Sequence, residues 1–451
     1  MVLSRKLKSN NLSCYTEKIL HAYIKQNSHL VVALSGGVDS VVLLHLLVIL
    51  SKKIQFTLSA VHVDHGISNN ATAWSKFCCD LCHAADIPIT VVHLKINKHS
   101  GISLEAAARN ERYQVFNQLK ADYVVLAQHL DDQAETLLLQ LLRGAGAKGL
   151  GAMPIIRKQP ADMAPYILRP LLEIARIRIE EYAKQNKLSW ITDESNNSIA
   201  FNRNYLRHQI FPLLKKRYPG YQKTLLRTSR HLAEASNLLD ELAEIDYKNC
   251  TVSGNIQVAS LHKLSLARAR NLLRYVFSKQ GVILPSTAKL ADILHQLLSS
   301  RRDNKLHVTF GNTEIRCYKG IMYIMPKNTM PETQWRLSWH GEKQLFLADL
   351  NGTICFIQLE NQGINIQKLM SQPVTIRPRL GGERFYPDCK RPRRSLKNLL
   401  QEARMPPWKR KTLPLLFCEE HLVWVPEIGI DCNFQVKPGE SGLVPVWEPT
   451  L

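Results

Sequence analysis

Alternating apolar and polar stretches divide residues 1–215 into short strands and longer helices. Apolar runs of strand length occur at Val31–Leu34, Phe56–Asp64, Pro88–Leu94 and Tyr123–Ala127. Runs of this length, bounded by turn residues, are typical of strands buried on both faces of a sheet. Helical spacing fills the stretches between them, and a further helix is expected around Tyr15–Gln26. The alternation predicts an α/β fold with a parallel sheet covered by helices on both faces.

The pattern changes after residue 215. Residues 216–330 are expected to be mainly helical, with amphipathic stretches at Leu225–Tyr247 and Leu264–Phe277. Lys305–Met325 alternates like a β-hairpin around a Gly-Asn turn. We take residues 331–370 as a connecting region with some strand content, and residues 371–451 as a small α+β domain.

A glycine turn separates the first strand from the helix that follows it. Ser35-Gly36-Gly37-Val38-Asp39-Ser40 leads directly into the helically spaced Val41–Leu47. Glycines let backbone N–H groups approach a phosphate, and the helix N-terminus favours negative charge. The Gly-Lys-Ser/Thr ending of a P-loop is missing, so this turn is suited to a pyrophosphate held by serines and backbone amides. An ordinary glycine-rich turn is the alternative.

Polar residues also end the second and fourth predicted strands, as His62–Gly66 and Gln128-His129. The carboxyl ends of parallel strands meet at one edge of the sheet, where ligands bind. Asp131 and Asp132 follow in the first turn of a helix, and Glu135 lies one turn further on. These acids are explained either as caps of a surface helix or as a site for Mg²⁺ beside phosphate oxygens.

The charge of the chain favours a nucleic-acid partner. Its 451 residues include 59 Lys and Arg against 38 Asp and Glu, a net charge of +21. Such an excess supplies affinity for phosphodiesters by releasing counterions. Residues 371–416 alone contain twelve Lys and Arg against three acids, interleaved with Phe385, Tyr386 and Trp408. This segment is expected to bind an RNA backbone, the alternative being a solvated basic face.

The remaining composition points to the cytoplasm and away from membranes. No apolar run approaches the ~18 residues of a membrane span, and Met1–Lys8 lacks the hydrophobic core of a signal peptide. Ten scattered cysteines predict reduced thiols. Cys79-x-x-Cys82, with Cys78 and His83 beside it, has the spacing of metal ligands but no second pair, so buried helix cysteines are favoured.

Taken in order, several motifs resemble the tRNA(Ile)-lysidine synthetase family of the PP-loop (N-type ATP pyrophosphatase) superfamily. The first four are Ser35–Ser40, His62–Gly66, Ala108-Arg109-x-x-Arg112-Tyr113 and Gln128–Thr136; later ones are Leu141–Gly146, Leu168–Leu172, Trp190–Asn196, Phe201–Arg207, Arg379–Phe385, Lys397–Glu402, Pro406–Trp408 and Val423–Pro426. Gln128 departs from the pattern, which has Gly or His there in many members. The resemblance implies a Rossmann-like ATP pyrophosphatase domain, a tRNA-contacting middle domain and a tRNA-binding C-terminal domain.

The same resemblance implies a reaction. ATP adenylates C2 of the wobble cytidine (position 34) of the isoleucine tRNA with a CAU anticodon, and pyrophosphate leaves. The amine of L-lysine then displaces AMP and forms lysidine, which changes codon recognition from AUG to AUA. The co-substrate is ATP and the metal ion is Mg²⁺.

Roles for individual residues follow from the resemblance. The expected ATP contacts are Ser35, Gly36, Gly37, Val38, Asp39, Ser40 and His62. The expected Mg²⁺ ligands are Asp39, Asp132 and Glu135, and the expected catalytic residues are Asp39, Arg109, Arg112, His129 and Asp132. The expected tRNA contacts are Arg203, Arg207, Arg379, Arg384, Arg393, Arg394 and Lys397. Both His129 and Asp132 remain open as acceptors of the lysine proton.

Two other functions stay open on the sequence alone. An ATP-dependent tRNA thiolation enzyme would share the pyrophosphate loop, although the single Cys-x-x-Cys pair argues against it. A non-catalytic RNA-binding protein would keep the fold without the chemistry. No membrane partner is expected, and the sequence leaves both a monomer and a homodimer open.

Overall fold

The computed structural model describes residues 12–66, 70–94, 104–159, 164–193, 198–299, 306–327 and 335–449. The chain forms two compact units, residues 1–242 and 243–451. The division falls within the long helix α10 (Tyr221–Cys250). Met1–Lys8, considered above for signal-peptide character, lies outside the described residues.

The first unit contains a six-stranded sheet with the order β3-β2-β1-β4-β6-β5. Its strands are β1 (Ser28–Ala33), β2 (Phe56–Asp64), β3 (Ile89–His93), β4 (Tyr123–Val125), β5 (Ile156–Arg157) and β6 (Tyr166–Leu168). The first four and β6 are parallel, and β5 runs antiparallel to β6 at the edge. The predicted parallel sheet is therefore confirmed. Its order reverses between β1 and β4, which is the position where such sheets bind ligands.

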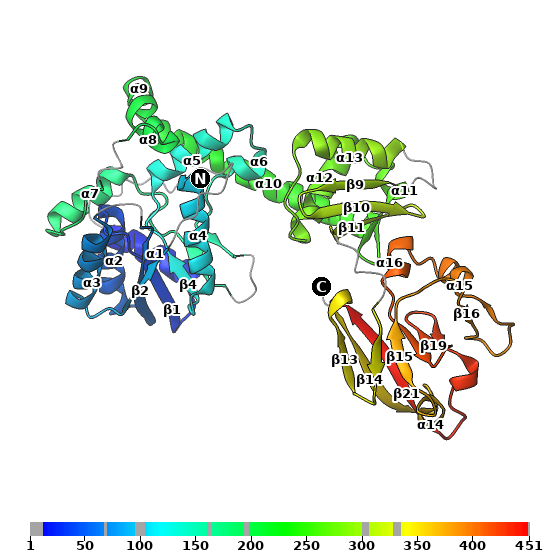
Figure 1. Cartoon of the computed structure of the whole chain (residues 1–451). Helices are drawn as coiled ribbons and strands as arrows, with labels where there is room; N and C mark the ends of the chain where they lie inside the picture. Colours follow the sequence, from blue (N-terminus) through cyan, green and yellow to red (C-terminus); the bar gives the residue numbers. More distant parts are fainter. Residues whose placement is uncertain are drawn as a thin grey trace. The chain divides into compact units, whose positions relative to one another are not determined.

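Helices cover both faces of this sheet (Figure 1). Helices α1 (Leu12–Tyr23), α2 (Val38–Ser51), α3 (Ala71–Ala84) and α7 (Arg176–Gln185) pack on one face. Helix α4 (Leu104–Gln118) packs on the other, through Tyr113 and Phe116. The further helices are α5 (Leu130–Leu142), α6 (Ala147–Leu150), α8 (Asn202–Tyr205), a π-helical turn at Leu206–Ile210, and α9 (Phe211–Arg217).

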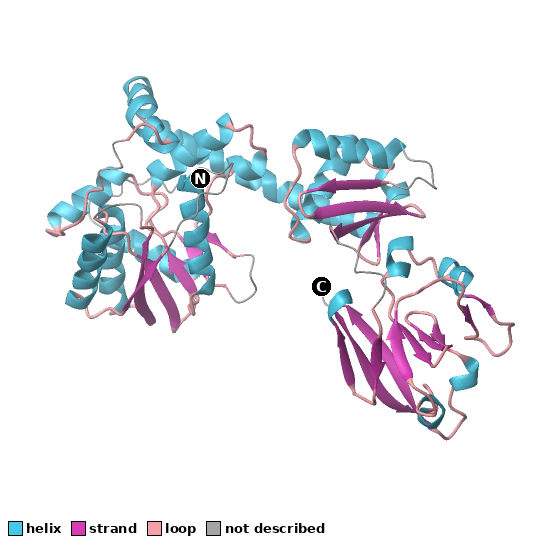
Figure 2. Cartoon of the chain, in the orientation of Figure 1, coloured by secondary structure: helices cyan, strands magenta, loops and turns pink. Residues whose placement is uncertain are grey.

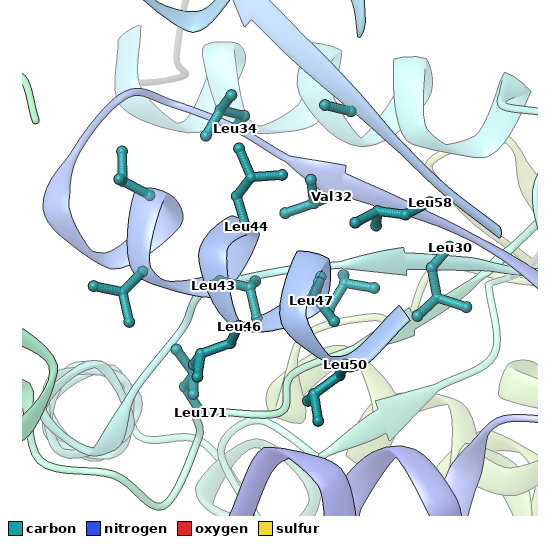
Figure 3. Close-up of a cluster of buried hydrophobic side chains, with 14 of the residues drawn as sticks. Leu30, Val32, Leu34, Leu43, Leu44, Leu46, Leu47, Leu50, Leu58 and Leu171 are labelled. Atoms are coloured by element: carbon teal, nitrogen blue, oxygen red, sulfur yellow. The ribbon is translucent and has the colours of Figure 1, made fainter. Parts of the chain in front are cut away.

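Helix α2 is the most buried of these elements because nearly all its side chains are aliphatic. Its leucines Leu43, Leu46, Leu47 and Leu50 are fully buried against strands β1 and β2 and against Leu171 (Figure 3). Each such side chain contributes about 1.5–3 kcal/mol by leaving water. The N-terminus of α2, and with it the glycine turn, is therefore held rigidly at the sheet edge.

The first part of the second unit contains helices α11 (Val258–Leu261), α12 (Leu266–Lys279) and α13 (Thr287–Ser299). They pack on an antiparallel sheet of order β7-β8-β11-β10-β9. Its strands are β7 (Thr251–Val252), β8 (Asn255–Gln257), β9 (His307–Phe310), β10 (Thr313–Tyr318) and β11 (Ile321–Pro326). The hairpin expected around Gly311-Asn312 is β9–β10. The expected helices are thus accompanied by a sheet that the sequence analysis recognised only in part.

The last part of the chain is mainly β-structure, apart from its short helices (Figure 2). One sheet has the order β12-β15-β18-β19-β20, a second has β13-β14-β21, and β16 pairs with β17. The strands are β12 (Leu337–Trp339), β13 (Gln344–Leu347), β14 (Gly352–Glu360), β15 (Val374–Arg377), β16 (Arg384–Phe385), β17 (Arg394–Ser395), β18 (Leu415–Cys418), β19 (His421–Val425), β20 (Gly429–Ile430) and β21 (Ser441–Pro449); the helices are α14 (Ile366–Leu369), α15 (Leu396–Glu402) and α16 (Pro407–Lys411). Strands β12–β14, from the segment taken above as a connecting region, share a core with β15, β18 and β19.

One expectation about the cysteines is wrong. Cys389 and Cys432 form a disulfide, with their Cα atoms 5.6 Å apart, so the ten thiols are not all free. The sequence could not show this pair, because 43 positions separate the two residues and only the tertiary fold brings them together. None of the described helices is long and apolar enough to cross a bilayer.

Candidate active site

The glycine turn joins β1 to α2 and is closed by its own serines. The Ser40 hydroxyl donates to the Gly37 carbonyl (2.9 Å), accepts from the Ser35 amide (3.2 Å) and contacts the Ser35 hydroxyl (3.1 Å). Gly37 occupies the cap position of α2 in an extended conformation. The first N–H groups of a helix have no acceptor within it, so the turn presents backbone donors for an anion.

Gly36 is a glycine for conformational and steric reasons. Its φ is +83°, in the left-handed region, and a Cβ atom there would lie 2.8 Å from Ile191 Cδ1 and 3.3 Å from Cys78 Sγ. The Gly36 carbonyl also accepts a hydrogen bond from the Ile191 amide (2.9 Å). The segment after α7 and the buried helix α3 therefore fix the path of the turn.

Asp39, at the start of α2, lies beside His129, which caps α5. The Asp39 carboxylate is 3.7 Å from His129 Nε2 and 4.0 Å from Arg176 Nε. Burial raises the pKa of Asp39, but its interactions with His129, Arg176 and Arg207 outweigh burial and lower the pKa below its usual value. The glycine turn and the helix after β4 thus meet at the switch point of the sheet.

His129 is 2% exposed and lies among three carboxylates. Its ring nitrogens are 3.7, 3.8 and 3.4 Å from oxygens of Asp39, Asp131 and Asp132. Burial lowers the pKa of His129, but Asp132, Asp39 and Asp131 together raise it to about 9. Nδ1 also lies 3.4 Å from the Asp132 amide, a long contact in which a neutral ring would accept. Three carboxylates within 4 Å outweigh this weak bond, so His129 is an imidazolium at neutral pH.

Asp131 orders neighbouring helices. Its carboxylate accepts from the Arg176 amide at the first turn of α7 (2.9 Å) and from the Gln222 side chain on α10. Both carboxylate oxygens therefore have donors within the protein. Asp131 ties α5 to α7 and α10, and it contributes charge to His129 from that position.

Glu135 is buried and paired with Arg207. Arg207 donates to Glu135 Oε1 through Nε (2.8 Å) and NH2 (2.7 Å), and its NH2 is 3.6 Å from Asp132. Glu135 is 1% exposed, and its Oε2 has no hydrogen-bond partner in the described part of the chain. Burial raises the pKa of Glu135 more than the charge of Arg207 lowers it. Arg207, expected as a tRNA contact, therefore lies in the acidic cluster, on the π-helical turn after α8.

The other predicted site residues of the first unit occupy different neighbourhoods. His62 is buried, and its Nδ1 lies 2.8 Å from the Leu34 carbonyl just before the glycine turn. Burial is the main cause that lowers the pKa of the His65 ring, and the positive charge of Arg112 lowers it further. The charge of Arg203 reaches Glu135. Arg109 instead contacts Tyr113, with its NH2 3.5 Å from the phenol oxygen.

Most of the cations predicted to bind tRNA in the C-terminal part have acidic partners. Arg379 pairs with Glu383, Arg394 with Glu402, and Arg393 lies 3.8 Å from the fully buried Asp431. Two differ. Arg384 is exposed and, among the described residues, donates to the Arg393 carbonyl. Lys397 is exposed, and its side chain has no hydrogen-bond or ion-pair partner in the described residues.

The carboxylates were tested for their fit to Mg²⁺. Asp39 Oδ1 has no hydrogen-bond partner among the described residues, and the Asp39 side chain is 28% exposed beside the phosphate-binding turn. Asp132 and Glu135 are instead engaged by Arg207. In the described residues, no group of three or more His, Cys, Asp or Glu side chains is arranged so that it could hold a metal ion by itself. Mg²⁺ needs only one or two carboxylates besides phosphate oxygens, and Asp39 meets that requirement.

Two contributors were missed by sequence reasoning. Arg176 was missed because it lies outside the motifs used above, at the start of α7, and only the fold brings it to Asp39. Arg169 is 1% exposed and donates to the side chain of Gln128. Arg169 belongs to the motif Leu168–Leu172 used above, but strand β6 was not predicted. Because Arg169 directly follows β6, that strand places it at the carboxyl ends of the parallel strands. The departure at Gln128 thus has a physical role as the acceptor for a buried guanidinium.

Comparison with known proteins agrees with this geometry. Family models match residues 8–214 (PP-loop domain), 257–323 (TilS substrate binding domain) and 374–447 (TilS substrate C-terminal domain). A tRNA(Ile)-lysidine synthase of Nitrosomonas europaea is 52% identical over 96% of this chain and 94% of its own length. The chain belongs to the tRNA(Ile)-lysidine synthase family. A second such relative, from Azoarcus sp., is 38% identical over 96% of this chain and 95% of its own.

One solved structure matches part of the chain at low similarity. The U34-tRNA thiolase NcsA from Methanococcus maripaludis, with its [4Fe-4S] cluster, covers 49% of this chain and 78% of its own at 21% identity and a TM-score of 0.43. That similarity carries no argument about function.

Cys78 and Cys82 are fully buried in α3, as favoured above, and burial raises the pKa of their thiols to about 12 and about 11.

Proposed function

We propose that this chain uses ATP to adenylate the wobble cytidine of the isoleucine tRNA with a CAU anticodon and then attaches L-lysine to form lysidine. The contact of Asp39 with His129 carries the proposal. It joins an anion-binding turn to a cluster of carboxylates, and the two halves of the reaction need these two features. Membership of the family and the basic C-terminal segment support the same function.

The turn serves the first half of the reaction. Backbone amides at the start of α2, with Ser35 and Ser40, bind the β- and γ-phosphates that leave as pyrophosphate. Mg²⁺ held by Asp39 and the phosphates would supply charge compensation. His62 lies on β2, the strand next to β1, and is proposed to contact the adenine. Arg112, whose charge acts on His65, is proposed to bind the phosphate of the adenylate. The cytidine O2 attacks the α-phosphorus, and the bond to pyrophosphate breaks.

The carboxylates serve the second half. Asp132 and Glu135 attract the lysine ammonium, which must lose a proton before its nitrogen attacks C2 and AMP leaves. The three carboxylates around His129 raise its pKa and favour the protonated ring at neutral pH, which argues against His129 as the acceptor. Glu135 Oε2 has no hydrogen-bond partner among the described residues, and burial raises the pKa of Glu135, so Glu135 joins Asp132 as a candidate acceptor of the lysine proton. Arg207 positions Glu135 through Oε1.

The C-terminal segment is proposed to bind the tRNA backbone. Arg384 and Lys397 are the predicted contacts best placed for phosphates, because Arg379, Arg393 and Arg394 are engaged by acids. We also propose that the protein works in the cytoplasm, where tRNA is modified. A homodimer stays a prediction, to be measured by light scattering.

The test is pyrophosphate release from ATP, measured with and without L-lysine and a CAU-anticodon isoleucine tRNA transcript, while labelled lysine is followed into RNA. Lysine incorporation that requires both ATP and tRNA is expected. Asp39→Asn should abolish it, whereas the control Asp80→Asn, at an exposed position on α3, should not. Pyrophosphate release without lysine incorporation would indicate another adenylating modification such as thiolation, and no release would leave an RNA-binding protein.

A further inference from the structure

Three arginines gather around Tyr113 on the α4 side of the sheet. The guanidinium carbons of Arg109 and Arg157 lie 5.1 and 5.0 Å from the centre of the Tyr113 ring. Arg169 follows β6, is 1% exposed and interacts with the phenol of Tyr113. The three come from α4, β5 and the end of β6, which are far apart in the sequence.

This cluster carries positive charge without a recorded counter-charge. Arg169 donates to Gln128 Oε1 and to the Pro154 carbonyl (2.9 Å), both neutral acceptors. None of the three arginines forms an ion pair with a carboxylate among the described side chains. Burial raises the pKa of Tyr113, but the charges of Arg109, Arg169 and Arg157 outweigh it and lower the pKa below its usual value. A buried cation left without an anion is costly, so the cluster is suited to an anionic ligand.

The arginine cluster lies at the same edge of the sheet as the carboxylates around His129, but beside a different strand. Gln128 and His129 are consecutive at the end of β4; Gln128 contacts Arg169, whereas His129 contacts Asp39. Strand β6 is separated from β1 by β4, which at ~4.8 Å per strand places its end about 10 Å from the glycine turn. An anion bound at the arginines would therefore be distinct from the phosphates that we propose bind at the turn.

We propose that Arg109, Arg157 and Arg169 bind a phosphodiester of the substrate RNA adjacent to the nucleotide that is modified. This inference rests on the proposed function, because a base presented to the edge of the sheet brings its flanking phosphates with it. Planar guanidinium groups bind phosphate oxygens in pairs. Stacking of Arg109 and Arg157 on Tyr113 fixes two of the three groups before the RNA arrives. Phosphate contacts of this kind position the strand and do not read its sequence.

The test uses Arg157→Gln, because Arg157 is exposed and its removal leaves the core intact. The control is Lys158→Gln, an exposed basic neighbour outside the cluster. The probe is an anticodon stem–loop with the CAU anticodon, either unmodified or with a neutral methylphosphonate on one side of the wobble cytidine. Arg157→Gln should weaken stem–loop binding roughly three- to ten-fold and reduce the salt slope by about 0.7, as for one phosphate of a single strand.

The combination of variant and probe identifies the ligand. A methylphosphonate on one side of the wobble cytidine should weaken binding of the stem–loop to the wild type. The same substitution should not weaken its binding to Arg157→Gln any further. Weaker ATP binding with unchanged RNA binding would overturn the proposal and assign the cluster to ATP. Equal effects of Arg157→Gln and Lys158→Gln would also overturn it, since only general charge would then matter. Because RNA binding is measured without turnover, failure of lysine incorporation would refute the proposed function separately.

Tyr113→Phe provides a second variant that keeps the ring and removes the hydroxyl that Arg109 contacts. It should weaken binding of the unmodified stem–loop less than Arg157→Gln does. An effect on ATP binding alone would contradict the assignment of the cluster to RNA.

Discussion

The charge of His129 gives the sharpest prediction about this site. In the folded chain three carboxylates surround the ring and raise its pKa to about 9, from 6.5. The folded state therefore holds the proton more tightly than the unfolded chain. The resulting stabilisation is complete below pH 6.5 and is lost as the pH rises through about 9. At 1.36 kcal/mol per pH unit this amounts to roughly 3 kcal/mol.

The pKa itself can be read from the ring carbon shifts of histidine-labelled protein, with the His129 resonance assigned by its loss in His129→Gln. The value should lie well above 6.5 in the wild type and fall by about one unit or more in Asp39→Asn, which removes one of the three carboxylates. Urea unfolding at pH 6.5 and pH 9 should show a pH dependence that His129→Gln removes. The control His83→Gln, at an exposed position on α3, should leave it unchanged.

A His129 pKa at or below 6.5 would refute this reasoning. It would mean that the ring is neutral and that Nδ1 accepts from the Asp132 amide across the 3.4 Å contact. His129 would then return as a candidate acceptor of the lysine proton. An unchanged pH dependence of unfolding in His129→Gln would lead to the same conclusion.

Three further outcomes are expected. Arg207→Gln leaves the buried Glu135 unpaired and should lower the free energy of unfolding by about 3–5 kcal/mol. The double variant with Glu135→Gln should recover part of this loss, and a loss equal to the sum of the two single variants would contradict the pairing. Gly36→Ala should cost about 1–2 kcal/mol because of its left-handed backbone, more than Gly37→Ala, whose φ is −71°, and equal costs in urea unfolding would count against this. Thiol titration of the denatured, unreduced chain should find the eight free cysteines and, after reduction, all ten. Ten thiols before reduction would rule the disulfide out. Replacing Cys389 and Cys432 by Ser should destabilise the second unit by about 2–4 kcal/mol.

The local order of residues was sufficient to predict the parallel sheet and the meeting of the glycine turn with His129 at its edge. Buried parallel strands are continuous apolar runs, so β1, β2, β3 and β4 were visible from hydropathy alone. The turn at Ser35–Ser40 was visible because glycine and a helix start are local features. The convergence of His129 with Asp39 followed from the rule that parallel strands end at one edge. The short strands β5 and β6 were missed, since runs of two or three residues have no readable period.

Only the tertiary structure decided which charges meet. Arg207 was assigned to RNA from its sequence neighbourhood, yet it pairs with Glu135, 72 positions away. Arg169 and Arg157 join Arg109 because β5, β6 and α4 are brought together by the sheet. The Cys389–Cys432 pair likewise depends on a chain reversal that no spacing reveals. Periodicity records which side of one element is buried, whereas charge pairing and pKa depend on contacts between elements, which the fold alone determines.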